Sequence, residues 1–221
     1  MDPAAFIQWA LDDARTLEER YATLILVERG EDSWHAAHKT GRGRHWETSA
    51  RLRRERYLNP AYQPVYTRQS LERAAEIFAK WEEVSLSGQG YQERPIRDIT
   101  VLKFLPHLRK VGIGAEVGDI SLLAEMPNLQ DLSLTCPLCE DYRPLGRCRQ
   151  LRKLHVSFLV PWPVVDGLGE LQGLEELVLR GNLLALPRAC IFPWCGRPHW
   201  NAFRWPRGMC ARCRRCRRVR C

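Results

Sequence analysis

The chain has 221 residues, with 34 basic and 26 acidic side chains, and it is long enough to bury one large core or two modest ones. Its longest apolar run near the start, residues 22–27, is too short to span a bilayer. The chain also opens with an acidic residue, Asp2, where a secretory signal has a basic head. We therefore expect a cytoplasmic protein without a membrane partner.

The net charge of +8 comes from one end of the chain. Residues 188–221, called the tail below, contain ten arginines, three tryptophans, six of the nine cysteines and no acidic residue, so 24 basic and 26 acidic side chains remain in residues 1–187. We therefore expect no binding to nucleic acid except through the tail. The other three cysteines, Cys136, Cys139 and Cys148, are typical of a reduced intracellular protein and not of a disulfide scaffold.

Residues 1–95 predict helices. Asp2 and Pro3 are an N-cap and a first-turn signal for a helix through "AAFIQWALDDARTLEERYATLILVERG". A second helix is predicted at "RHWETSARLRRERYLN", which ends before Pro60, and a third at "SLERAAEIFAKWEE", which is expected to begin at Ser70. The apolar residues of the third helix share one face, as in a helix that packs on a core.

Residues 98–187 contain an internal repeat of four segments. Apolar residues recur in matching columns at near-constant intervals, and within each unit the last two lie two positions apart. That spacing puts both on one face of a short strand, while the preceding leucines turn the chain back. The columns are Leu102, Leu123, Leu145 and Leu168; Leu108, Leu129, Leu151 and Leu174; Val111, Leu132, Leu154 and Leu177; and Ile113, Leu134, Val156 and Leu179.

This pattern resembles the leucine-rich repeat family, most closely at "LEELVLRGNLLALP", residues 174–187. The resemblance covers about residues 96–187. It implies an α/β fold, a solenoid of about four repeats with parallel strands, whose concave face usually binds protein. Solenoids need their terminal apolar edge covered, so we expect residues 1–95 to form a helical N-terminal cap. The family's asparagine after the strand is present only at Asn182, which predicts irregular turns.

The outward columns of these strands form the candidate binding surface. One column, Lys110, Asp131, Lys153 and Glu176, alternates in sign, so neighbouring charges are expected to pair with one another. The next two columns are small and mostly neutral, and among them His155 and Arg180 are the expected specific contacts. The candidate binding residues are Lys110, Asp131, Ser133, Lys153, His155, Glu176 and Arg180.

Two features could suggest chemistry. The "CPLC" of residues 136–139 has the spacing of a redox motif, but it follows a repeat strand and lacks a strand-to-helix context. Cys148 stands in a core column of the repeat and is expected to be a small core residue. His35 and His38 have no third metal ligand fixed by spacing. We expect no catalytic residue and no cofactor.

The tail allows three interpretations. Cys190, Cys195, Cys210 and Cys213 could hold zinc through four thiolates, and the arginines and tryptophans could bind nucleic acid. Alternatively the tail translates a shifted frame of a longer repeat protein: Cys and Trp codons both begin with TG, and reading one base earlier turns each into a Leu, Val or Met codon. We favour this third hypothesis, with an irregular tail that is not natively folded. The sequence then predicts a non-catalytic protein-binding module with a protein partner; the alternative is a zinc- or nucleic-acid-binding protein that acts through its tail.

Overall fold

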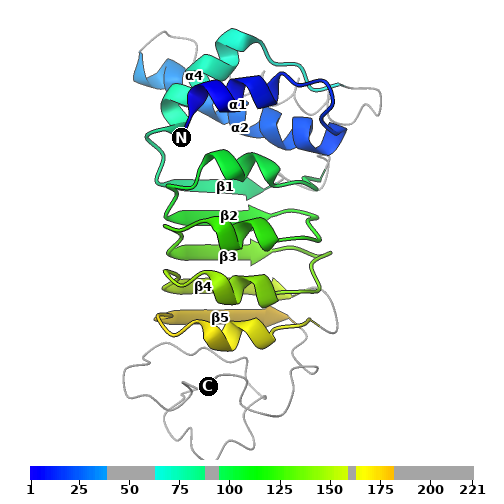
Figure 1. Cartoon of the computed structure of the whole chain (residues 1–221), viewed down its shortest axis with the longest axis vertical. Coiled ribbons are helices and arrows are strands. Elements are labelled where there is room, and N and C mark those ends of the chain that lie inside the picture. Colours follow the sequence, from blue (N-terminus) through cyan, green and yellow to red (C-terminus); the bar gives the residue numbers. More distant parts are fainter. Residues whose placement is uncertain (39–62, 88–94, 159–162, 182–221) are drawn as a thin grey trace, which may run out of the picture.

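The structure, a computed structural model, describes residues 1–38, 63–87, 95–158 and 163–181. Within these ranges, three α-helices stand at one end of a stack of parallel strands (Figure 1). The helices are α1 (Pro3–Ala10), α2 (Leu17–Ala37) and α4 (Arg68–Phe78). The strands pair in the order β1-β2-β3-β4-β5 and are β1 (Glu83–Ser87), β2 (Lys110–Gly114), β3 (Asp131–Thr135), β4 (Lys153–Phe158) and β5 (Glu176–Gly181).

A short 3-10 helix precedes each of the strands β2 to β5. These helices are η2 (Thr100–Phe104), η3 (Ser121–Glu125), η4 (Arg143–Arg147) and η5 (Asp166–Glu170). They pack in a row on one face of the sheet (Figure 1). The column Val111, Leu132, Leu154 and Leu177 lies in register on adjacent parallel strands, which confirms the repeat.

Local capping signals set the helix boundaries. The Asp2 carboxylate accepts hydrogen bonds from the backbone N–H groups of Ala4 and Ala5 and so starts α1. The prediction of a single long helix after Pro3 is wrong, because a capping box between Thr16 and Glu19 starts a new helix, α2. Ser70 is not the N-cap of α4; it is the third helical residue, in a capping box with Thr67.

The sheet begins earlier than the repeat pattern indicated. Residues 83–87 fall in the region expected to be helical, yet they form β1, which pairs with β2 from Glu83↔Lys110 to Ser87↔Gly114. The described sheet therefore has five strands instead of the four that the repeat columns predicted. The helix expected at residues 44–59 lies outside the described residues.

Backbone hydrogen bonds join each coil to the next at the same place. The carbonyl oxygen of Arg109 accepts from the N–H groups of Gln130 and Asp131, at 2.8 and 2.9 Å. The carbonyl oxygens of Glu82, Gln130 and Arg152 do the same for the coils that follow them. Because one carbonyl oxygen takes two donors just before each strand, every strand starts at a fixed height relative to its neighbour.

One continuous core runs from the helices through the repeats. Phe6 of α1 is fully buried, and its ring lies 5.5 Å from that of Phe78 in α4 and 5.6 Å from that of Phe104 in η2. The helices thus cover the apolar end of the first coil, as a solenoid cap does. In the described ranges, none of the helices combines the length and the apolar character that a membrane crossing requires.

Candidate functional site

The face of the sheet away from the 3-10 helices, called the open face below, carries three columns of side chains in register. None of these residues is buried. Because the strands are parallel and their register does not slip, each column runs straight across all five strands. The columns are Glu83, Lys110, Asp131, Lys153 and Glu176; Ser85, Gly112, Ser133, His155 and Val178; and Ser87, Gly114, Thr135, Ser157 and Arg180.

The first column is a ladder of alternating charge. Lys110 Nζ lies 3.1 Å from a carboxylate oxygen of Glu83, and Lys153 Nζ lies 3.9 Å from one of Glu176. The hydrogen bond with Glu83, then the negative charges of Glu83 and Asp131, raise the pKa of Lys110. The expected pairing of these charges is therefore present. Glu83, which the repeat analysis missed because it lies on β1, extends the ladder by one residue.

The middle column holds the imidazole of the open face. The Nε2 atom of His155 lies 3.0 Å from Oε1 of Glu176, within hydrogen-bond distance. Glu176 thus contacts both Lys153 and His155, which fixes its carboxylate against β4. Toward β1 the column becomes small, with Ser133, Gly112 and Ser85, so the backbone of β2 is accessible there.

The third column ends in an arginine. Arg180 is exposed on β5, and in the described ranges it has no ion pair, in contrast to Lys110 and Lys153. Its neighbours in register are Ser157, Thr135 and Gly114, which carry no charge. The structure therefore places all seven predicted binding residues on one face, with two charged residues, Glu176 and Arg180, on the same strand.

The helix α2 borders the open face at β1. The guanidinium of Arg29 donates to the backbone carbonyl oxygens of Ser85 and Ser87, so it occupies acceptors at the edge of the sheet. A cavity of about 390 Å³ lies here, lined among others by Arg29, Asp32 and Trp81. No local pattern in the sequence predicts this contact, because its partners are far apart in the chain.

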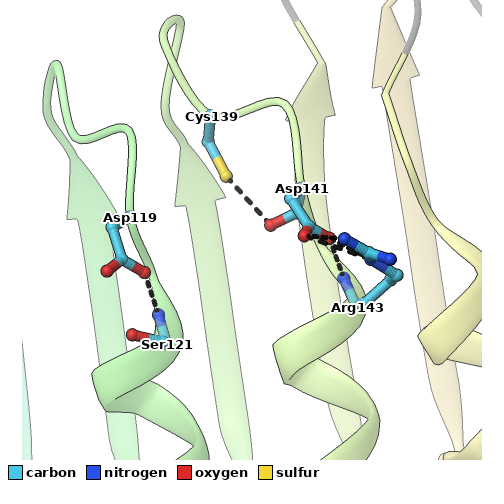
Figure 2. A network of polar contacts seen from close by, with 5 residues as sticks. All are labelled: Asp119, Ser121, Cys139, Asp141 and Arg143. Atoms are coloured by element: carbon cyan, nitrogen blue, oxygen red, sulfur yellow. Dashed lines mark hydrogen bonds and ion pairs between the residues drawn. The ribbon is translucent and has the colours of Figure 1, made fainter.

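Aspartates organise the loops that lead from the strands to the 3-10 helices. Asp98, Asp119 and Asp141 each accept a hydrogen bond from the backbone N–H two residues later, at 2.7, 2.8 and 2.9 Å. Asp141 also binds the guanidinium of Arg143 with both oxygens (Figure 2). The hydrogen bonds from Arg143 hold the pKa of the Asp141 carboxyl below its ordinary value. Each of these aspartates therefore accepts a backbone N–H group in the loop at the start of a 3-10 helix.

The three cysteines of the described chain are buried free thiols. Burial raises the pKa of Cys136 to about 12 and those of Cys139 and Cys148 to about 11. The expectation that Cys148 is a core residue is confirmed, since it is 3% exposed. In the described ranges, no group of three or more His, Cys, Asp or Glu residues is placed to hold a metal ion. The alternative zinc ligands Cys190, Cys195, Cys210 and Cys213 lie outside the described residues, as does the whole tail.

No family model and no curated protein matches the chain. Among solved structures, a leucine-rich-repeat protein of Leptospira interrogans is similar, with 20% identity and a TM-score of 0.41 over 49% of this chain and 27% of that one. Internalin C2 of Listeria monocytogenes is similar with 21% identity and a TM-score of 0.33, over 49% of this chain and 47% of that one. The matched part thus spans about a quarter and about half of these two proteins.

The fold follows from the chain's own geometry. Leucines recur at near-constant intervals, each unit places a 3-10 helix before a parallel strand, and units contact their neighbours through one shared core. The described chain is a leucine-rich-repeat solenoid with a helical N-terminal cap.

Proposed function

We propose that this chain is a non-catalytic protein-binding module and that its partner contacts the open face. The observation that supports this most is the unbroken register of exposed side chains across five strands. A surface of this kind presents side chains at regular spacing on a rigid backbone, so little conformational entropy is lost when a partner binds.

The chemistry of the open face favours a partner with polar groups and little net charge. Opposite charges already neutralise one another along the first column, so a strongly charged partner would gain little there. The serines, Thr135 and the backbone around Gly112 and Gly114 offer hydrogen bonds and close approach. His155 and Arg180 are the larger side chains that would contact the partner, and we expect them to contribute most to affinity.

A binding role without chemistry fits the state of the thiols. Thiols are the strongest nucleophiles among the side chains of the repeats, yet Cys136 and Cys139 are fully buried. Their raised pKa values keep them protonated near neutral pH.

We also propose that the protein is cytoplasmic, which cell fractionation with a tagged full-length chain would test.

Two matched substitutions test the proposed surface. Ser133→Arg places a long charged side chain at the centre of the open face, and Glu125→Arg places the same side chain on η3, on the opposite side; both positions are exposed. Proteins captured by the unchanged chain are identified by mass spectrometry, purified and titrated calorimetrically. We expect Ser133→Arg to weaken the binding of the true partner at least ~10-fold, while Glu125→Arg leaves it unchanged.

Binding of the partner to the other face would overturn the proposal. A partner that binds the Ser133→Arg chain as tightly as the unchanged one, and loses affinity only with Glu125→Arg, uses the other face. Circular dichroism and a melting curve for each variant ensure that the affinities are compared between folded proteins. His155→Ala and Arg180→Ala then measure the two contacts that we expect to dominate.

A further inference from the structure

The turn between β3 and η4 holds two cysteines at its two ends. The backbone N–H of Cys139 donates to the carbonyl oxygen of Cys136 at 3.2 Å, which closes a four-residue β-turn. A β-turn keeps its first and last Cα atoms within about 7 Å, and a disulfide joins residues whose Cα atoms are about 4.4–6.8 Å apart. The backbone of this turn therefore brings the two residues into the range that a disulfide needs.

Both side chains are fully buried. Cys136 and Cys139 are each 0% exposed and belong to the continuous core of the repeats. After burial, the charge of Cys139 is the next cause that raises the pKa of Cys136. Between them, Leu138 at the tip of the turn is 55% exposed. The turn thus buries its two thiols beneath a solvent-exposed tip.

The thiol of Cys139 is connected to the start of η4. Its Sγ–H group donates to the backbone carbonyl oxygen of Asp141 at 3.5 Å, and the Asp141 carboxylate binds Arg143 (Figure 2). Burial raises the pKa of Cys139 to about 11 and that of Cys136 to about 12, so Cys139 is the more readily ionised of the two thiols. Cys139 is therefore better placed than Cys136 to react first.

We propose that Cys136 and Cys139 form a reversible dithiol–disulfide pair that closes the β-turn before η4. The oxidant is a low-molecular-weight disulfide such as oxidised glutathione. The Cys139 thiolate attacks one sulfur of the oxidant and releases one glutathione thiolate, which leaves a mixed disulfide. The Cys136 thiolate then attacks the Cys139 sulfur and releases the second. The protein loses two electrons and two protons, and the oxidant is reduced to two thiols.

The reaction goes through a locally opened turn, since neither thiol is exposed in the closed structure. Opening frees Cys139 from Asp141, while the strand β3 before the turn and η4 after it keep the two residues close. Cys148 provides an internal comparison. It is also buried and donates to the carbonyl oxygen of Leu123 at 3.4 Å, but it lies in the following coil, away from this turn.

Peptide mapping of the full chain tests the proposal. Trypsin releases residues 111–147 as one peptide, because Arg143 precedes Pro144 and is not cut; this peptide contains Cys136 and Cys139 and no other cysteine. The folded protein is equilibrated in glutathione buffers of increasing oxidised fraction, quenched with acid, alkylated in denaturant and digested. We expect the peptide to lose both alkylation sites together, to carry the mass of an internal disulfide, and to regain both sites after treatment with dithiothreitol.

Three results would overturn the proposal: a peptide 111–147 that stays fully alkylated in every buffer in which the chain is folded, one that carries only glutathione, or one cross-linked to a cysteine of the tail. Cys139→Ser is the matched control, since its hydroxyl can still donate to Asp141 while its peptide has one thiol and cannot form the internal disulfide. If this variant fails to fold, the reversible loss of both sites in the unchanged chain still decides the question. Oxidation is also expected to raise the melting temperature, and reduction to reverse the shift.

Discussion

Gly146 of η4 and Gly167 of η5 pack backbone against backbone, with no space for a side chain between them. A Cβ atom added to Gly146 would lie 3.1 Å from the carbonyl carbon of Gly167 and would collide with its oxygen. A Cβ atom on Gly167 would lie 2.7 Å from the Cα of Arg143. These two glycines allow neighbouring coils to approach closely on the helical side of the solenoid.

We expect Gly146→Ala to lower the free energy of unfolding by about 1–3 kcal/mol, the usual cost of forcing extra volume into a packed region. Gly112→Ala is the control, because its Cβ would sit 3.5 Å from the Ser85 hydroxyl, an ordinary contact. The control should change stability by less than about 0.5 kcal/mol. Urea denaturation measures both, and equal effects of the two substitutions would show that the glycine contact is not tight.

Arg29→Ala should destabilise the cap at its contact with β1. The carbonyl oxygens of Ser85 and Ser87 lose a charged donor. Because the contact is partly exposed, we expect the free energy of unfolding to fall by only about 1 kcal/mol. Arg29→Lys retains the charge, but an ammonium group cannot donate to both carbonyl oxygens as a planar guanidinium does. It should therefore restore only part of the lost stability. Hydrogen exchange of the β1 amides measures the local effect, and unchanged exchange in Arg29→Ala would contradict the edge contact.

Arg15 joins α1, α2 and the segment before α4. It is 8% exposed and donates to Ala10, Thr23 and Tyr66 at 3.0, 2.6 and 2.7 Å. Its guanidinium carbon lies 3.5 Å from the centre of the Trp9 ring. Arg15→Met should lower the free energy of unfolding by about 2–4 kcal/mol, because the cation–π contact and the charged hydrogen bonds are lost. Chemical denaturation measures this loss.

Two further observations check the role of Arg15. Burial raises the pKa of Tyr66 while Arg15 lowers it, so Arg15→Met should raise that pKa further in an NMR titration. Lys103→Met is the control. Its Nζ atom lies 4.7 Å from the same Trp9 ring, but the side chain is exposed, so the loss should stay below about 1 kcal/mol. A larger loss from Lys103→Met than from Arg15→Met would contradict the buried network.

The Asp141–Arg143 pair predicts a pH dependence. Because the folded pKa of Asp141 is below its ordinary value, the pair contributes stability at pH values above that ordinary value and loses it as the pH falls through the folded value. Arg143→Ala should move the Asp141 pKa up toward its ordinary value, followed by carboxyl NMR. The stability difference between this variant and the unchanged chain should be present at neutral pH and vanish in acid. Arg147→Ala, also exposed on η4, should show neither effect.

The tail gives a separate prediction. If it is not a natively folded segment, the purified full chain contains no stoichiometric zinc, and a chain ending at residue 187 melts at the same temperature as the full one. Metal analysis and calorimetry measure these two quantities. Stoichiometric zinc that is lost in Cys210→Ser and Cys213→Ser would instead favour the metal-binding alternative.

Periodicity was sufficient to predict the solenoid, because an apolar column that recurs at near-constant intervals has few ways to be buried. The same reasoning placed Lys110, Asp131, Lys153 and Glu176 in one column, and the register confirms that placement. The repeat pattern missed β1, because this strand precedes β2 by a longer interval and lacks the leucines of the repeat. Its alternation of Val84 and Leu86 with serines was a usable strand signal.

The misplaced helix boundaries had signals in the sequence as well. The spacing of Thr16 and Glu19 is that of a capping box, and it marked the break between α1 and α2. The contacts of Arg29 and Arg15 had no such signal. Arg29 joins α2 to β1, and Arg15, just before α2, contacts Tyr66 in the segment before α4, so both contacts connect segments that are distant in the chain. Side-chain contacts between distant segments follow from the assembled fold and not from any local pattern.

The alternating charges of the ladder also limit how this solenoid can be lengthened. The signs alternate from Glu83 through Lys110, Asp131 and Lys153 to Glu176, so each coil differs in sign from both of its neighbours. Duplicating a single coil would set two like charges side by side, whereas duplicating two consecutive coils would preserve the alternation. A solenoid of this design can therefore lengthen more easily by even steps than by odd ones.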